Sequence, residues 1–316
     1  MDGTDTDDTR VERNRGFGHG QDSFEPLGPE CTLVTVGRPL ETSAWERLAG
    51  LMHGRPEILL RLHTAASRDL EPLRFFPSLK RLSVDLHGLE DIAGFAHLKD
   101  GLEQLDFGKA KKRFSLRFLD GMPSLQGLSL EGHSKDIAAI SRLSRLTQLS
   151  FRGITLPDVS LLTSFPELRI FSLALGGTRD LEHLAGLSKL EILHLLRINK
   201  LADLAILGRL TSLRILSVDS MPNVRSLPSL AALTRLESVE LDTLKGLTDF
   251  SGVAAAPALQ RLIVAGTPLL DVEAFRCLVA HPTLAELRVY PSLGGAGVKK
   301  PVLEGVKRLL PSVTRT

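Results

Sequence analysis

The stretch LEILHL at Leu190–Leu195 decides the fold, because its pattern returns at Leu213–Val218 as LRILSV and precedes it at Leu168–Leu173 as LRIFSL. The pattern is LxxLxL, in which Val or Phe can replace a leucine. The other copies are LKRLSV (79–84), LEQLDF (102–107), LQGLSL (125–130), LTQLSF (146–151), LESVEL (236–241), LQRLIV (259–264) and LAELRV (284–289). Neighbouring copies begin 21 to 25 residues apart. Ten phased copies predict a stack of structural repeats.

Each copy predicts a strand followed by a tight return segment. The end of the phrase alternates apolar and polar residues, which is typical of a strand with one buried face. After a short loop, apolar residues recur at every third position, as at Leu181, Leu184 and Leu187. That spacing favours a 3-10 turn over a full α-helix. One unit cannot bury its own leucines, so neighbouring units must stack into a continuous core.

The composition agrees with a soluble repeat protein. The chain has 316 residues, of which 62 are leucine and only 5% are aromatic. Its net charge of +2 creates no strong field for nucleic acid or membranes. Cys31 and Cys277 are far apart in the sequence, so we expect no disulfide framework, and since the first residues lack an apolar stretch and no apolar run reaches about 18 residues, we expect neither a secretory leader nor a membrane span. We therefore expect a cytoplasmic monomer that binds no nucleic acid and no membrane.

The sequence divides into four predicted segments. They are a disordered tail at 1–28, an N-terminal cap with a degenerate first repeat at 29–78, ten repeats at 79–290, and a C-terminal cap or tail at 291–316. In the N-terminal cap, Thr32–Val36 predicts a strand and Ser43–Glu46 a capping box that opens a helix ending near His53. Ile58–Leu62 then supplies the degenerate repeat. Val302–Leu310 predicts a closing helix at the other end.

These repeats resemble the leucine-rich repeat family, over about Ile58 to Tyr290. The similar subclass has 22-residue units and includes bacterial internalins and a phosphatase-regulating protein of eukaryotes. The resemblance implies an α/β right-handed solenoid, with a curved parallel sheet on the concave side, short 3-10 or helical turns on the convex side, and a strand–helix N-terminal cap. The family usually has an asparagine after the strand that hydrogen-bonds the loop backbone. Only Asn199 and Asn223 lie near that place here, so we expect less regular loops.

The resemblance also implies that outward-facing strand residues bind a partner. Strand alternation places Ile170, Ile192 and Ile215 on that face, where solvent would otherwise favour polar residues. An apolar centre with a charged rim is typical of a protein-binding surface. The alternative is that β-branched residues simply suit strands. The predicted partner-binding residues are Ile170, Ile192, His194, Leu196, Ile215, Asp219, Glu240 and Asp242.

Catalytic and metal sites have weaker support in the sequence. His63, Ser83 and Asp85 would lie close together on the predicted sheet and suggest a hydrolase, but no oxyanion hole accompanies them. A metal site built from His63, His87, Asp85 and Asp106 lacks a fixed ligand spacing. We therefore predict no catalytic residue, no cofactor and no metal. The basic run Lys109–Arg113 is interpreted as a solvated loop.

The sequence thus predicts a noncatalytic intracellular interaction module of bacterial origin, which binds an unidentified protein on its concave sheet. A second hypothesis is a regulatory or targeting subunit of an enzyme such as a phosphatase. A third, of a different class, is a hydrolase centred on Ser83. The partner, the biological process and the role of the tail lie beyond these observations.

Overall fold

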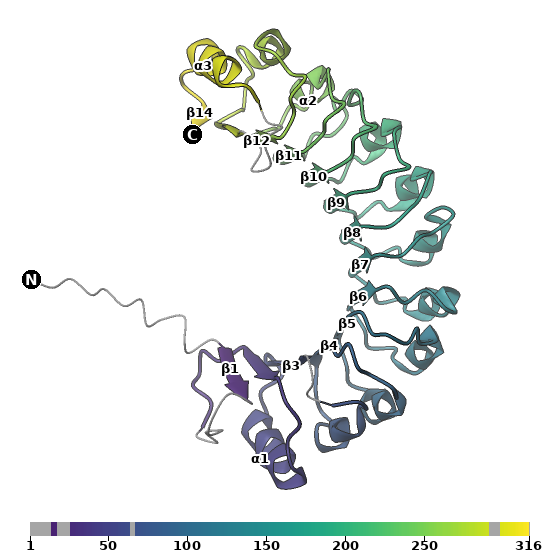
Figure 1. The fold of residues 1–316 in the computed structure, drawn as a ribbon. Coiled ribbons are helices and arrows are strands. Elements are labelled where there is room, and N and C mark those ends of the chain that lie inside the picture. The colour runs from purple at the N-terminus through teal and green to yellow at the C-terminus, as the bar shows by residue number, and fades with distance from the viewer. Residues whose placement is uncertain (1–13, 18–25, 64–66, 291–297, 316) are drawn as a thin grey trace, which may run out of the picture. The chain divides into compact units, whose positions relative to one another are not determined.

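The structure is a computed structural model that describes residues 14–17, 26–63, 67–290 and 298–315. The chain forms two compact units, residues 1–146 and residues 147–316. Within each unit, parallel strands lie on one side and short helical segments lie on the other (Figure 1). We call the strand surface that faces away from the helical segments the open face.

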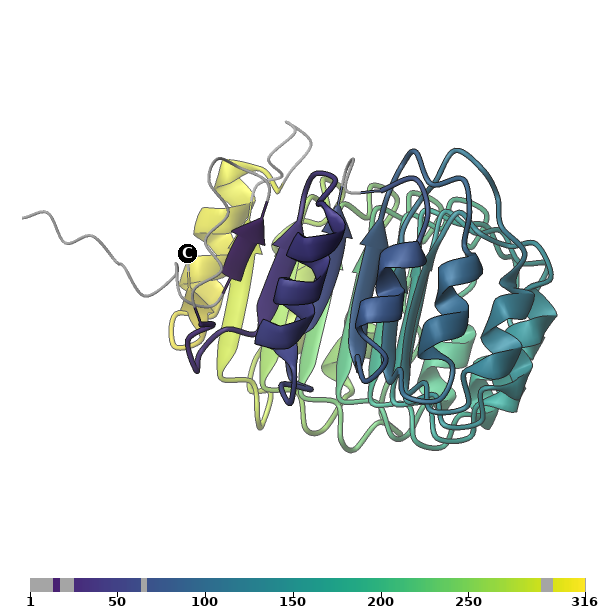
Figure 2. The same cartoon turned by 90° about the horizontal axis from the view of Figure 1, so that it is seen from below.

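Unit 1 stacks its strands in chain order. The strands are β1 (Asn14–Phe17), β2 (Leu33–Val36), β3 (Leu59–His63), β4 (Arg81–Asp85), β5 (Gln104–Phe107) and β6 (Gly127–Glu131). The helical segments are α1 (Thr42–Met52) and the 3-10 segments η2 (Glu71–Phe75), η3 (Ala93–Leu98), η4 (Leu116–Gly121) and η5 (Ile137–Arg142). Each strand pairs in parallel with the next. Figure 2 shows α1 on the same side of the sheet as the 3-10 segments that follow it.

Unit 2 repeats the same arrangement. Its strands are β7 (Gln148–Arg152), β8 (Ile170–Ala174), β9 (Ile192–Leu196), β10 (Ile215–Asp219), β11 (Ser238–Asp242), β12 (Arg261–Ala265), β13 (Glu286–Tyr290) and β14 (Thr314–Arg315). Its helical segments are η6 (Ser160–Ser164), η7 (Glu182–Gly186), η8 (Ala205–Arg209), α2 (Ser251–Ala254), η9 (Glu273–Leu278) and α3 (Lys300–Leu309). These strands also pair in parallel and in chain order.

Burial along β2 to β13 follows the predicted alternation, except that Ala174 at the end of β8 is also buried. In β9, Leu193 and Leu195 are 0% and 1% exposed, while Ile192, His194 and Leu196 between and beside them are half-buried. The inward leucines of neighbouring strands stack into one core, which is the arrangement that a repeat needs because it cannot bury them alone. The predicted solenoid of parallel strands and short 3-10 turns is confirmed.

The N-terminal cap forms a strand and a helix, although the helix begins differently from the prediction. Its N-cap is Glu41, which makes no side-chain capping hydrogen bond, so the predicted capping box at Ser43–Glu46 is wrong. Amphipathicity explains the helix instead, since Trp45 and Leu48 are buried. The Trp45 ring meets Phe76 edge-on, at 6.1 Å between ring centroids. The helix therefore covers the first apolar layer of unit 1.

The predicted disordered tail and the terminal segments have different outcomes. Asn14–Phe17, inside the segment expected to be disordered, forms β1 and pairs with β2. Residues 1–13 and 18–25 of that tail lie outside the described residues. The closing helix predicted at Val302–Leu310 is present as α3, two residues longer at its start. The boundaries of the four segments stay predictions.

The loops after the strands of unit 2 are regular, contrary to the expectation from the missing asparagines. A left-handed residue with φ between 50° and 65° directly follows each of β7 to β12: Gly153, Leu175, Arg197, Ser220, Thr243 and Gly266. The Leu175 N–H donates to the Leu196 carbonyl at 2.9 Å, and the Arg197 N–H donates to the Asp219 carbonyl at 2.8 Å. Backbone amides thus connect these loops to the neighbouring repeat at regular positions. Asn223 still donates its side-chain amide to the Asn199 carbonyl.

Candidate functional site: the open face of β8–β11

Three isoleucines lie side by side on the open face of unit 2. Ile170 is in register with Ile192, which is in register with Ile215. Neighbouring strands are about 4.8 Å apart, so the row is about 10 Å long. Ile215 is 37% exposed, and the other two side chains are half-buried. The structure therefore leaves an aliphatic row at the surface, as the strand phase predicted.

A second row lies at the carboxyl ends of the same strands. Leu196 is in register with Asp219, and Asp219 is in register with Asp242. Leu175, which follows β8 directly, is 36% exposed and was missed by the sequence analysis. No signal could have found it, because strand alternation ends at Ala174 and the left-handed turn that follows sets the direction of Leu175. Aliphatic and acidic groups thus adjoin on this row.

The middle row is mostly small and polar. His194 lies between Ser172 and Ser217, and Glu240 is in register with Ser217. Ser172, His194 and Ser217 are half-buried, whereas Glu240 is exposed. The structure therefore brings all eight predicted partner-binding residues together on one face of β8–β11, and their role in binding stays a prediction.

Within the described parts of the chain, no lysine or arginine forms an ion pair with Asp219, Glu240 or Asp242. The Ser220 hydroxyl donates to Asp219 and the Thr243 hydroxyl donates to Asp242, both at 2.8 Å. Burial raises the pKa of Asp219, and the neighbouring Asp242 carboxylate raises this pKa further, against the lowering effects of the Ser220 bond and of Arg197. The cluster therefore carries charge that is only partly compensated.

The next acid along the sheet is neutralised, which makes the contrast informative. Glu286 on β13 accepts hydrogen bonds from Arg261 at 2.9 Å and from Arg288 at 2.7 Å. These bonds lower the pKa of Glu286. Acidic residues on this sheet thus differ: Glu286 has two arginines, whereas Asp219 and Asp242 each accept a hydrogen bond from a hydroxyl group.

The residues of the hydrolase hypothesis lie on the open face of unit 1. His63 Nδ1 is 3.0 Å from Asp85 Oδ2, and Arg61 binds the same carboxylate oxygen at 3.3 Å. Ser83 is in register with Arg61, not with His63, and among the described residues no hydrogen bond joins the Ser83 hydroxyl to the imidazole. The side chains of His63 and Asp85 are 44% and 43% exposed. The arrangement is a solvated ion pair rather than an activated nucleophile.

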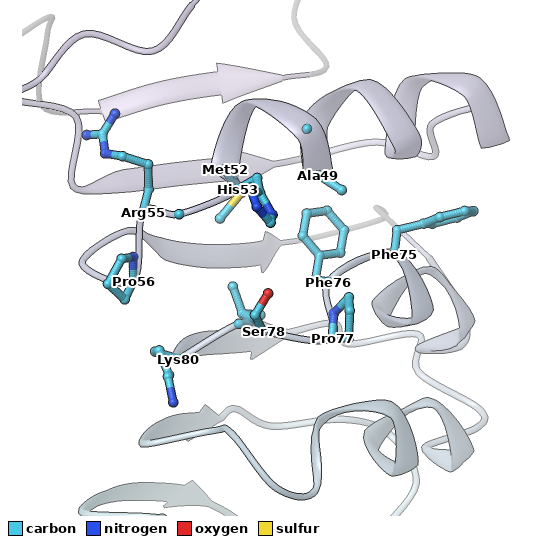
Figure 3. Close-up of a pocket in the computed structure, with 13 residues that line it drawn as sticks. Ala49, Met52, His53, Arg55, Pro56, Phe75, Phe76, Pro77, Ser78 and Lys80 are labelled. Atoms are coloured by element: carbon cyan, nitrogen blue, oxygen red, sulfur yellow. The ribbon is translucent and has the colours of Figure 1, made fainter.

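A hollow of about 570 Å³ lies between α1 and η2 in unit 1 (Figure 3). Met52 and Phe76 are buried at its floor, and the His53 side chain lies beside them. The Arg55 guanidinium already donates to the carbonyl oxygens of residues 28, 29 and 31, and Lys80 donates to the Gly101 carbonyl. Because these two cations have protein partners, we assign no ligand to this hollow.

The described residues offer neither a metal site nor a membrane-spanning helix. No group of three or more His, Cys, Asp or Glu side chains is arranged to hold a metal ion, and His63, His87, Asp85 and Asp106 do not converge in that way. Among the described helices, none has both the length and the apolar character that crossing a bilayer requires.

Comparisons with known proteins agree on the fold. No family model matches the sequence, and no curated protein is significantly similar to it. Among solved structures, an internalin (inlF) from Listeria monocytogenes shares 20% identity at a TM-score of 0.53, over 82% of this chain and 74% of that chain. The Toll–Spatzle complex from Drosophila gives 16% identity and a TM-score of 0.54 over 83% of this chain, which spans only 40% of the matched one. Together with the repeated strand, loop and 3-10 segment, these neighbours show that the chain has the leucine-rich repeat fold.

Proposed function

We propose that this protein is a noncatalytic interaction module that binds another protein on the open face of β8–β11. The row of Ile170, Ile192 and Ile215 carries the proposal. Single apolar residues are common on protein surfaces, but here three aliphatic side chains lie in register on one outward sheet face. Leu196 extends the apolar area toward Asp219. An apolar centre bordered by charged and polar groups is how protein-binding surfaces are composed.

Two further features support a binding role over a catalytic one. The open face of β8–β11 is a sheet surface, whereas hydrolytic catalysis requires a nucleophile, a base and oxyanion donors in one sheltered site. The Toll–Spatzle neighbour is a complex, which supports protein binding as a use of this fold. We further propose that the protein is a monomer, of bacterial origin, located in the cytoplasm. If the bound protein is an enzyme, the module is its regulatory or targeting subunit, for example of a phosphatase.

Two matched substitutions test the proposal. Ile192→Asp places a charge in the middle of the aliphatic row, while Val279→Asp places the same charge on a 50% exposed valine that follows η9, away from the strands. We expect Ile192→Asp to reduce partner capture from a native lysate by tenfold or more, with a melting temperature near that of the parent. Val279→Asp should capture normally.

Capture that survives Ile192→Asp would show that the isoleucine row is incidental. The captured protein then separates the two roles of the module. An enzyme whose rate changes when this chain is added identifies a regulatory subunit, an enzyme whose rate stays the same identifies a targeting subunit, and a partner without enzymatic activity identifies a simple adaptor.

A further inference from the structure

The chemistry of the partner follows from how apolar and acidic groups adjoin on the open face of β8–β11. We infer that the partner is a protein surface on which aliphatic side chains are bordered by lysine or arginine, with the cations lying against Asp219, Glu240 and Asp242. The inference rests on the proposed function and adds the class of partner to it.

The geometry sets two spacings that such a partner must match. Leu196 is in register with Asp219, so an aliphatic and an acidic group lie on neighbouring strands about 4.8 Å apart. Ile215 and Asp219 are four residues apart on β10, which is about 13 Å at 3.3 Å per residue. The partner therefore needs one aliphatic side chain next to its cations and a second one about 13 Å away.

The charge distribution explains why the partner must be cationic. Asp219 and Asp242 are in register on neighbouring parallel strands, and like charges at such positions repel. A partner without cations would remove water from these carboxylates and leave them unpaired, which is costly. A partner with lysine or arginine in this place gains charge-assisted hydrogen bonds instead. The acidic row thus rejects neutral or acidic partners as well as attracting basic ones.

Comparison with Glu286 shows that the requirement for a cationic partner is confined to β10 and β11. The Glu286 carboxylate already forms ion pairs with Arg261 and Arg288, so a cation of the partner would gain little by binding at β13. On β10 and β11 the corresponding hydrogen bonds come from the hydroxyls of Ser220 and Thr243, which bring no positive charge.

A display library of random 16-residue peptides, panned on the full chain and counter-selected on the Ile192→Asp chain, tests the inference. Selected peptides are then measured on the parent and on the triple variant Asp219→Asn, Glu240→Gln, Asp242→Asn. The control is Glu167→Gln, Glu182→Gln, Glu273→Gln, which removes the same three charges from exposed ion pairs outside the strands. We expect peptides rich in lysine or arginine beside aliphatic residues.

We expect their affinity to fall tenfold or more on the triple variant, to fall less than twofold on the control, and to weaken with added salt. Peptides that require Ile192 but lack cations, or that bind the triple variant unchanged, would overturn the partner chemistry and leave the proposed function standing. A library from which no peptide depends on Ile192 would overturn both. Bound peptides that match a segment of this chain would replace the inferred partner by a second copy.

Discussion

His133 shows how one residue can depart from the repeat pattern and still satisfy its chemistry. It occupies a buried position two residues after β6, where unit 2 places aliphatic residues such as Ile198 and Leu244, and it is 1% exposed. Its ring stacks on Phe107 at 4.2 Å between centroids. Nδ1 accepts a hydrogen bond from the Phe114 N–H at 3.4 Å, and Nε2 donates to the Gly108 carbonyl at 3.0 Å. Both nitrogens are used, so the neutral ring fits.

The neutral ring makes stability depend on pH. Burial lowers the pKa of His133, and Arg113 lowers it further, against the raising effects of the Gly108 bond and of Glu131. The unfolded chain therefore binds a proton at this residue more readily than the folded chain does, so stability falls as pH drops below about 6.5. We expect the melting temperature of the parent to fall more steeply between pH 7.5 and 5.5 than that of His133→Gln.

An exposed histidine provides the comparison for that measurement. His183 lies in η7 and is exposed, so His183→Gln serves as the control for the substitution itself. Equal slopes for the parent and His133→Gln would contradict the account, because the buried ring would then contribute nothing to the linkage.

At the scale of the element, the two faces of a strand differ in burial, as β9 illustrates. Leu193 is 0% exposed and lies in register between Phe171 and Leu216. Leu193→Ala leaves a cavity in this stack, and we expect it to lower the free energy of unfolding by about 2–5 kcal/mol. Denaturant titration followed by circular dichroism measures this loss. His194→Ala, one residue further and on the open face, should change stability by less than about 1 kcal/mol.

A reversal of these two costs would mean that the strand phase is wrong by one residue, because such a slip moves every side chain to the other face. The slip would also place Ile192 in the core. The same two variants therefore test the fold and the position of the proposed interface together.

The elements also show which features a sequence can predict. The strands and 3-10 segments follow from leucine spacing alone, and so does the row of Ile170, Ile192 and Ile215, because alternation assigns each residue to a face. The regular loops could not be predicted, because the left-handed positions include Leu175, Arg197 and other residues that rarely adopt positive φ. Backbone hydrogen bonds between neighbouring repeats hold these residues in place. Such bonds cannot be recognised in the sequence, because they do not depend on the side chain. The strand β1 was missed for a similar reason, since its residues are mostly polar or small.

For the whole molecule, the net charge does not reveal the local distribution of charge on the sheet. The overall value of +2 predicts no preferred partner. The three acids on β10 and β11, whose charge is only partly compensated, still create a local negative field beside the aliphatic row, within about a Debye length at physiological salt. The inferred site could be located from the sequence by strand register, whereas only the structure showed that, among the described residues, no lysine or arginine forms an ion pair with its acids.

The same local field argues that the protein does not pair with itself through this face. In a two-fold dimer both copies would contribute the same surface, so two acidic clusters would be buried together without cations. We expect a monomer of 34.4 kDa at micromolar concentrations, measured by light scattering after size-exclusion chromatography. Because repulsion is the cause, the triple variant Asp219→Asn, Glu240→Gln, Asp242→Asn should associate more than the parent, and the control triple should not. A parental dimer that Ile192→Asp dissociates would show instead that the aliphatic row outweighs the charge.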